Sequence, residues 1–162
     1  MKKSLSLLII AIIALTSSIN ANAWTDRNTF GLKGPVKSVI GNNNCDEYLE
    51  FEENGDIIFE EDPDIYWAFI ERDNKGRITY YPREEYTYNN KGQVSTITIV
   101  GGGRESITKL YYNTKGHVIK EITGGKSTTY TYQKFDSYGN WTKRTAKTGK
   151  RSTVQTRTIT YY

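Results

Sequence analysis

Acidic side chains are concentrated in one part of the chain. Between Asp46 and Asp64 the sequence holds ten aspartates and glutamates and no lysine or arginine. Two carboxylates that flank a cleft can hydrolyse a glycosidic bond. Carboxylate oxygens also bind calcium, with Glu60, Glu61, Asp62 and Asp64 as the weak candidate ligands. The structural alternative is a solvated acidic strand face with its turn; we favour it and expect no metal and no cofactor.

The chain has one cysteine and one histidine, Cys45 and His117. Together they could form a nucleophile–base pair, but neither stands in a setting that indicates activation. One His and one Cys also fall short of the ligand set of a zinc site. A single cysteine excludes an intramolecular disulfide and leaves Cys45 as a partly buried small residue, an intermolecular partner or a reactive thiol. We therefore predict no catalytic residue.

Aromatic residues are the third set that could bind a ligand. The chain has 13 tyrosines and three tryptophans, whose ring faces are apolar and whose tips form hydrogen bonds, a combination that suits sugars. Tyr130 and Tyr132 alternate on one face of a predicted strand, and Tyr138 and Trp141 lie at the turn that follows. Since a position beside a turn favours half exposure, Trp141 is the leading candidate for a sugar contact. The alternative places the tyrosines in the core, because Ile, Leu, Val, Met and Phe make up only about a fifth of residues 24–162.

These residues belong to a repeated element centred on a glycine. Five segments align, FEENGDI, RDNKGRI, YNNKGQV, YNTKGHV and FDSYGNW, with the common glycine at Gly55, Gly76, Gly92, Gly116 and Gly139. An acid or amide three residues before each glycine can start a turn through its own backbone. The glycine adopts positive φ without steric cost and closes a short hairpin loop. The residue four before the glycine, aromatic in four segments, is expected to pair across the hairpin with the apolar residue two after it.

Glycine-rich reversals of a second kind alternate with this repeat from Tyr86 onward. The segments between the turns are rich in Thr, Ile, Val and Tyr, as strands are. They predict strands at 84–88, 93–100, 105–112, 117–123, 127–135, 140–146 and 150–162. Before them we expect a strand at 34–41, a hairpin at 47–62, a central strand at 64–73 covered on both faces, and no helix. The predicted fold is all-β, an antiparallel meander of about 10–12 strands that forms a curved single sheet or a partly closed barrel.

The unit Tyr/Phe–Asp/Asn–x–x–Gly–x–apolar resembles the YD repeat of RHS-type proteins. It is similar in particular to the small exported YD-repeat-like proteins common in Bacteroidetes. The segment GLKGPVKSVI, residues 31–40, is similar to the entry segment of such proteins. The resemblance covers most of residues 31–146 and implies a meander of hairpins. In large RHS proteins such repeats enclose a toxin, whereas the five units found here are too few for an enclosure, and the resemblance brings no catalytic residue with it.

Residues 1–23 have the features of a secretory signal peptide. Lys2 and Lys3 precede an apolar run at 7–15, and Ala21, Asn22 and Ala23 form a cleavage site before Trp24. The apolar run is shorter than a membrane span, so contact with a membrane would be peripheral at most. We expect export in a Gram-negative bacterium, to the periplasm or the cell exterior, with residues 24–162 as a single domain.

Charge is distributed unevenly along the chain. The stretch after Asp136 has no acid and six basic residues, whereas residues 46–64 are acidic. The formal net charge of +4, of which two units belong to Lys2 and Lys3, is too small to indicate nucleic acid. We therefore predict a non-enzymatic exported binding module whose partner is a glycan or an envelope protein. The alternatives are a glycan hydrolase that uses carboxylates of residues 46–64 and an accessory or remnant element of an RHS-type toxin system.

Overall fold

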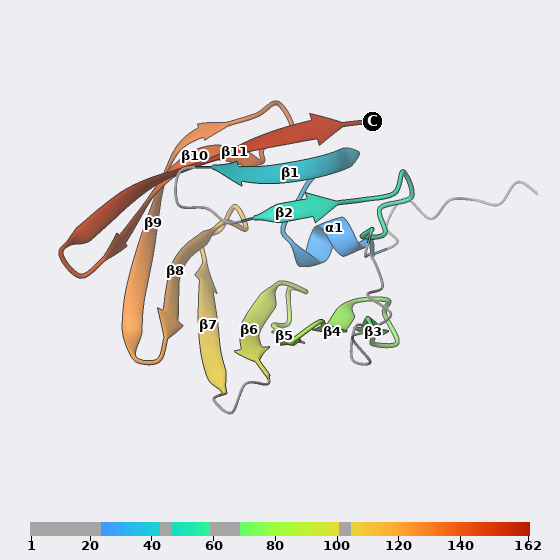
Figure 1. Cartoon of the computed structure of the whole chain (residues 1–162), viewed down its shortest axis with the longest axis horizontal. Helices are drawn as coiled ribbons and strands as arrows, with labels where there is room; N and C mark the ends of the chain where they lie inside the picture. Colours follow the sequence, from blue (N-terminus) through green and yellow to red (C-terminus); the bar gives the residue numbers. More distant parts are fainter. Residues whose placement is uncertain (1–23, 43–46, 59–68, 101–104) are drawn as a thin grey trace, which may run out of the picture.

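The protein is built from one antiparallel sheet (Figure 1). The computed structural model describes residues 24–42, 47–58, 69–100 and 105–162. In this part of the chain the sheet has eleven strands in the spatial order β2-β1-β11-β10-β9-β8-β7-β6-β5-β4-β3. The strands are β1 (Val36–Asn42), β2 (Tyr48–Glu50), β3 (Glu71–Arg72), β4 (Ile78–Tyr81), β5 (Glu84–Tyr88), β6 (Val94–Ile99), β7 (Ser106–Tyr112), β8 (Val118–Thr123), β9 (Lys126–Phe135), β10 (Trp141–Thr148) and β11 (Arg151–Tyr161). The predicted all-β meander is confirmed, and the sheet is curved and open.

The strands from β5 to β11 lie where the sequence predicts them, with ends that differ by no more than two residues. Two expectations for the N-terminal half are wrong. The described part of the predicted central strand at 64–73 contains β3, which is exposed at the edge of the sheet. The chain also has a single-turn helix, α1 (Asp26–Thr29), where no helix was expected. Within the described ranges, no helix has the length and apolar character needed to cross a membrane.

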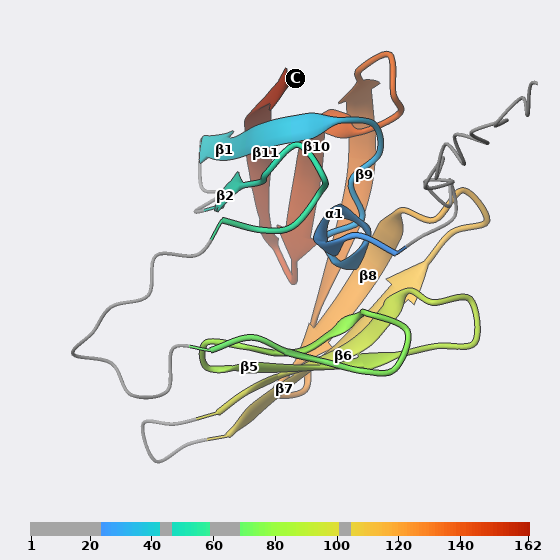
Figure 2. The same cartoon turned by 90° about the vertical axis from the view of Figure 1, so that its right-hand side faces the viewer.

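The sheet bends so that its two ends face each other. In Figure 2, β1 and β2 lie above, β5 and β6 lie below, and α1 lies between them. Strand β1 pairs with β11, the last strand of the chain, with Val39 opposite Ile159. The N-terminal strands β1 and β2 therefore lie next to the C-terminal end of the meander. This pairing joins segments that are far apart in the sequence, and it gives the sheet a concave side.

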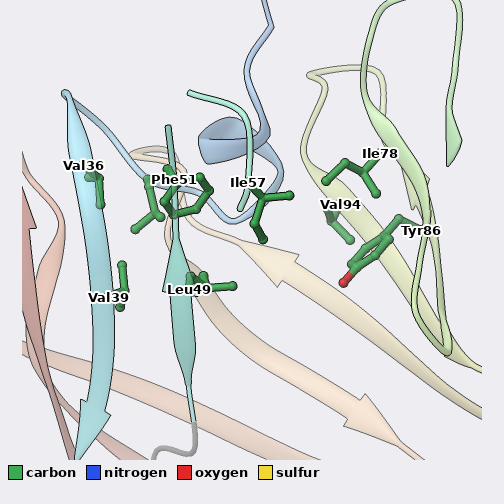
Figure 3. Packing of buried hydrophobic residues seen from close by; sticks show 9 residues of the cluster. Val36, Val39, Leu49, Phe51, Ile57, Ile78, Tyr86 and Val94 are labelled. Carbon is green, nitrogen blue, oxygen red and sulfur yellow. The ribbon is translucent and has the colours of Figure 1, made fainter. Parts of the chain in front are cut away.

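The hydrophobic core lies on this concave side, between the two ends of the sheet (Figure 3). The buried side chains are Leu32, Val36, Val39, Leu49, Phe51, Ile57, Ile78, Tyr86 and Val94. Val36 and Phe51 from one end and Ile78 from the other are 0% exposed. Full burial of a side chain of this size contributes about 1.5–3 kcal/mol. The cluster therefore holds the bend of the sheet.

The five repeat turns have the predicted geometry. Their glycines have φ between 77° and 99°, and each glycine N–H donates to the carbonyl three residues before it at 3.0–3.1 Å. In four turns an Asp or Asn Oδ1 accepts the N–H groups two and four residues on, at 2.9–3.1 Å. All five predicted cross-hairpin pairs are present: Phe51 with Ile57, Arg72 with Ile78, Tyr88 with Val94, Tyr112 with Val118 and Phe135 with Trp141. Because alternate turns of a meander lie together, the repeat turns gather at one end of the sheet, which we call the repeat-turn end.

Tyrosine hydroxyls join neighbouring hairpins on the concave side. Tyr88 donates to the carbonyl of Ile78 at 2.6 Å, and Tyr112 donates to that of Val94 at 2.7 Å. Tyr132 makes the same bond to Val118 at 2.6 Å. Each acceptor is the apolar residue two positions after a repeat glycine. These bonds hold the three rings half-buried on the concave face. The tyrosine hydroxyls are thereby engaged in hydrogen bonds that stabilise the sheet.

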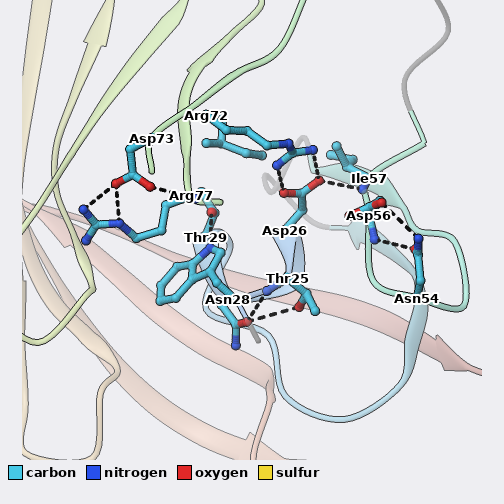
Figure 4. Close-up of polar contacts among 12 residues, drawn as sticks. Thr25, Asp26, Asn28, Thr29, Asn54, Asp56, Ile57, Arg72, Asp73 and Arg77 are labelled. Carbon is cyan, nitrogen blue, oxygen red and sulfur yellow. Dashed lines mark hydrogen bonds and ion pairs between the residues drawn. The ribbon is translucent and has the colours of Figure 1, made fainter. Parts of the chain in front are cut away.

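Helix α1 closes the gap between the two edges of the open sheet (Figure 4). Asp26, which is 1% exposed, accepts the Ile57 N–H at 2.9 Å beyond β2. The same carboxylate binds both terminal nitrogens of Arg72 in β3. Arg27 donates to the carbonyl of Val36 in β1 at 2.8 Å and to carbonyls of Glu52 and Glu53 in the repeat turn that follows β2. We call the contacts of Asp26 with Ile57 and Arg72 the edge clasp.

Candidate functional site

The concave face holds a cavity of about 570 Å³ beside the core. Its lining comes from Trp24 and α1, from Glu47 before β2, and from the strands β5 to β11 with the turns between them, including Tyr112, Tyr132 and Trp141. Small-molecule sites are usually clefts of roughly 300–1,000 Å³ with mostly apolar walls and a few polar groups. The curvature of the sheet thus produces a hollow of suitable size on the face where the aromatic residues gather.

Trp141, the first residue of β10, lies at one wall of this cavity. Its side chain is 8% exposed, so the expected half exposure is wrong. The ring faces the concave side and is covered by two arginines, because the guanidinium carbons of Arg144 and Arg157 both lie 4.1 Å from the ring centroid. A cation–π contact contributes about 0.5–2 kcal/mol, more as it loses water. Trp141 is therefore an organising residue of the site.

Arg144 lies on β10 between two aromatic rings. Its guanidinium carbon is 4.0 Å from the ring centroid of Tyr130 as well as 4.1 Å from that of Trp141. Its Nε donates to Oε1 of Gln155 at 2.7 Å. Among the residues that the structure describes, no carboxylate forms an ion pair with Arg144. The side chain is held in place by neutral groups and keeps its positive charge at the cavity wall.

Arg157, on the neighbouring strand β11, is 6% exposed. Its Nε donates to the carbonyl of Trp141 at 2.7 Å, and its Nη1 lies 3.4 Å from Oε1 of Glu47. Because a buried charge needs partners, Glu47 compensates Arg157. The two arginines thus differ: Arg157 has a carboxylate partner and Arg144 has neutral partners.

Among the residues that the structure describes, two carboxylates reach the cavity, Glu47 and Glu84. Glu47 belongs to the acidic region at 46–64, whereas Glu84 begins β5 at the other end of the sheet. Glu84 accepts a hydrogen bond from the hydroxyl of Tyr86. The calcium candidates Glu60, Glu61, Asp62 and Asp64, together with Cys45, lie outside the described residues. In the described part of the chain, no group of three His, Cys, Asp or Glu is arranged to hold a metal ion.

The structure divides the four predicted aromatic site residues between two places. Tyr132 and Trp141 line the cavity, and Tyr130 lies next to it against Arg144. Tyr138 lies at the repeat-turn end, 46% exposed, with its ring centroid 4.7 Å from that of Tyr161. Three of the four residues therefore share one neighbourhood.

The sequence analysis missed the roles of both arginines. Strict alternation along a strand would place Arg144, three residues after Trp141, on the opposite face. Register shifts between Trp141 and Lys143 and between Lys143 and Arg144 mark a bulge that returns Arg144 to the face of Trp141. The register of β5–β6 and of β7–β8 also shifts beside a repeat turn. The repeat turns in the sequence therefore mark the places where alternation along the next strand can be broken.

A second hollow, of about 710 Å³, shares His117 and Tyr132 with the cavity. The His117 ring centroid lies 4.7 Å from that of Phe135 and 5.3 Å from that of Tyr132, and Lys33 and Lys115 contribute to the lining. Burial lowers the pKa of His117; the Gly139 carbonyl opposes this, and the nearby cationic side chains lower the pKa further. The neutral imidazole is therefore favoured between the two hollows.

No protein-family model matches the chain, and no curated protein sequence matches it. The class that the structure defines is an all-β protein with one open, curved antiparallel sheet and an aromatic, arginine-bearing cavity on its concave side.

Proposed function

We propose that the protein is a non-enzymatic exported binding module and that a glycan binds in its concave cavity. The observation that carries the proposal is the wall of the cavity, which is lined by the rings of Tyr112 and Tyr132 and by the side-chain amides of Gln93 and Gln155. Apolar ring faces pack on sugar rings, and amides form hydrogen bonds with hydroxyl groups. The signal-peptide features of residues 1–23 support export.

The two adjacent hollows favour a chain-like ligand. The cavity and the second hollow meet at His117 and Tyr132, so consecutive units of one oligosaccharide can occupy both. The repeat turns support this arrangement because they place His117 and the segment from Phe135 to Trp141 side by side at the same end of the sheet. A relationship to YD-repeat proteins is likewise supported by the five turns.

A glycan array probed with the purified protein, followed by calorimetry on the glycans that bind, tests the proposal. We expect Tyr132→Ala to lower the affinity at least tenfold. Tyr138→Ala is the matched control, since it removes the same kind of side chain outside the cavity, and it should bind as the wild type does. An array without a bound glycan, or a loss of binding on Tyr138→Ala alone, would contradict the assignment to the cavity.

A second candidate function, glycan hydrolysis, is favoured by the two carboxylates in the cavity. Glycosidases place two carboxyl groups about 5–9.5 Å apart around the bond that they cleave. Glu47 and Glu84 reach the cavity from opposite ends of the sheet. Both already have partners, Arg157 and Tyr86, so binding remains the first proposal. Release of reducing ends that both Glu47→Gln and Glu84→Gln abolish would establish hydrolysis instead.

A further inference from the structure

The site has a guanidinium fixed in a ligand-facing position. Arg144 lines the cavity, and its planar group is positioned by the Tyr130 ring, the Trp141 ring and the amide oxygen of Gln155. A guanidinium carries five N–H donors in a rigid fork, and Gln155 occupies the one at Nε. The side chain is therefore ordered before a ligand arrives, which reduces the entropy lost on binding.

Glu121 of β8 accepts a hydrogen bond from the hydroxyl of Tyr130, on whose ring Arg144 stacks, but it does not line the cavity, where positive charge is in excess among the described residues. Of the acids that line the cavity, Glu47 pairs with Arg157, and Glu84 lies on β5 at the far end of the sheet, bound by Tyr86. The cavity lining also contains Lys91. The described residues that line the second hollow include Lys33 and Lys115 and no acid. Positive charge thus extends from Arg144 along the path shared by the two hollows.

Neighbouring titratable groups respond to this positive charge. Burial raises the pKa of Tyr132, and the charges of Arg144 and Arg157 oppose that rise. Lys33, Lys115 and Arg157 act on His117 in the direction that disfavours a further positive charge. An anionic group placed here would be attracted in a partly dry environment, where charge interactions are stronger than in water.

We propose that the ligand is an acidic glycan and that the carboxylate of one of its sugars binds the guanidinium of Arg144. The inference rests on the proposed function, since it names the class of glycan that enters the cavity. A carboxylate is planar and has two oxygens, so it matches two parallel N–H donors of the fork. The sugar ring that carries the carboxylate can then lie against the ring of Tyr132, which lines the same cavity as Arg144.

Matched pairs of probes test this inference on the wild-type protein. Oligogalacturonate and oligoglucuronate are each compared with their methyl esters, which keep the shape and lose the charge. We expect at least one acid to bind at least tenfold more tightly than its ester. Added salt should lower the affinity for the acid and leave the affinity for the ester unchanged. A sulfate ester of an otherwise neutral oligosaccharide is a third probe, and tighter binding of this probe than of either uronate would overturn the assignment to a carboxylate.

Variants then locate the charge. Arg144→Gln should reduce the acid-to-ester preference to near one, whereas Arg151→Gln, the same substitution at an exposed position at the start of β11, should keep it. A preference that survives Arg144→Gln would overturn the inference.

Equal binding of acids and esters, or binding of neutral glycans alone, would also overturn the inference and leave the proposed function intact. Binding of no glycan at all would remove both. If Arg144→Gln does not fold, the acid-to-ester ratio and its salt dependence in the wild type still decide.

Discussion

At the scale of single residues, Trp141 links the stability of the sheet to the site. Its ring is buried and lies under Arg144 and Arg157. Trp141→Ala should lower the free energy of unfolding by about 3–5 kcal/mol, because it leaves a cavity and removes the surface on which both guanidinium groups pack. Urea unfolding followed by circular dichroism measures the change. Tyr138→Ala, at an exposed aromatic pair, should cost only about 1 kcal/mol, and equal losses in the two variants would show that Trp141 is not structural.

His117 should make stability depend on pH. Its pKa in the folded protein is lowered, chiefly by burial, from the ordinary value of 6.5. Between the two pKa values the unfolded chain binds more protons than the folded one, so stability rises with pH in that window. The contribution is complete above pH 6.5 and is lost as the pH falls toward the folded pKa. Urea midpoints between pH 7.5 and 5 should therefore fall more steeply for the wild type than for His117→Gln. Parallel curves would contradict this.

At the scale of elements, the repeat turns depend on the conformation of their glycines. A Cβ added at Gly76 would meet no atom within 4 Å, and its φ is +77°. Gly76→Ala therefore tests backbone strain alone and should cost about 1–2 kcal/mol. Gly76→Asn should cost less, because Asn tolerates the left-handed region. Chemical denaturation of both variants checks the order, and equal costs for Ala and Asn would show that φ is not the limiting factor.

These elements are also what could be predicted from the sequence. Each repeat turn and its cross-hairpin pair lie within seven consecutive residues, as from Phe135 to Trp141. Local chemistry therefore sets the positions of the turns, and the turns set the strands from β5 to β11. The aromatic half of the site follows from the same pattern, since Tyr132 and Trp141 do line the cavity. The arginine half does not, because it depends on a bulge that alternation does not reveal.

At the scale of the whole molecule, the features that could not be predicted depend on contacts between distant segments. Val39 lies opposite Ile159 in the sheet, and nothing near either residue specifies the other. The position of β3 at the edge and the formation of α1 have the same origin. A helix of four residues is too short to be stable by its own hydrogen bonds, so α1 exists because Asp26 and Arg27 are bound by the rest of the protein.

The edge clasp should determine how far the two edges of the sheet separate. Asp26→Ala leaves the buried Ile57 N–H without its acceptor and releases Arg72, which should cost about 1–3 kcal/mol. Hydrogen exchange should accelerate in β2 and β3 and stay slow in β8–β10. The proposed binding of a glycan should weaken too, although Asp26 does not line the cavity. Glu105→Ala is the control, because it removes an exposed carboxylate just before β7, away from both edges of the sheet. Unchanged exchange at both edges in Asp26→Ala would show that the core alone holds the sheet bent.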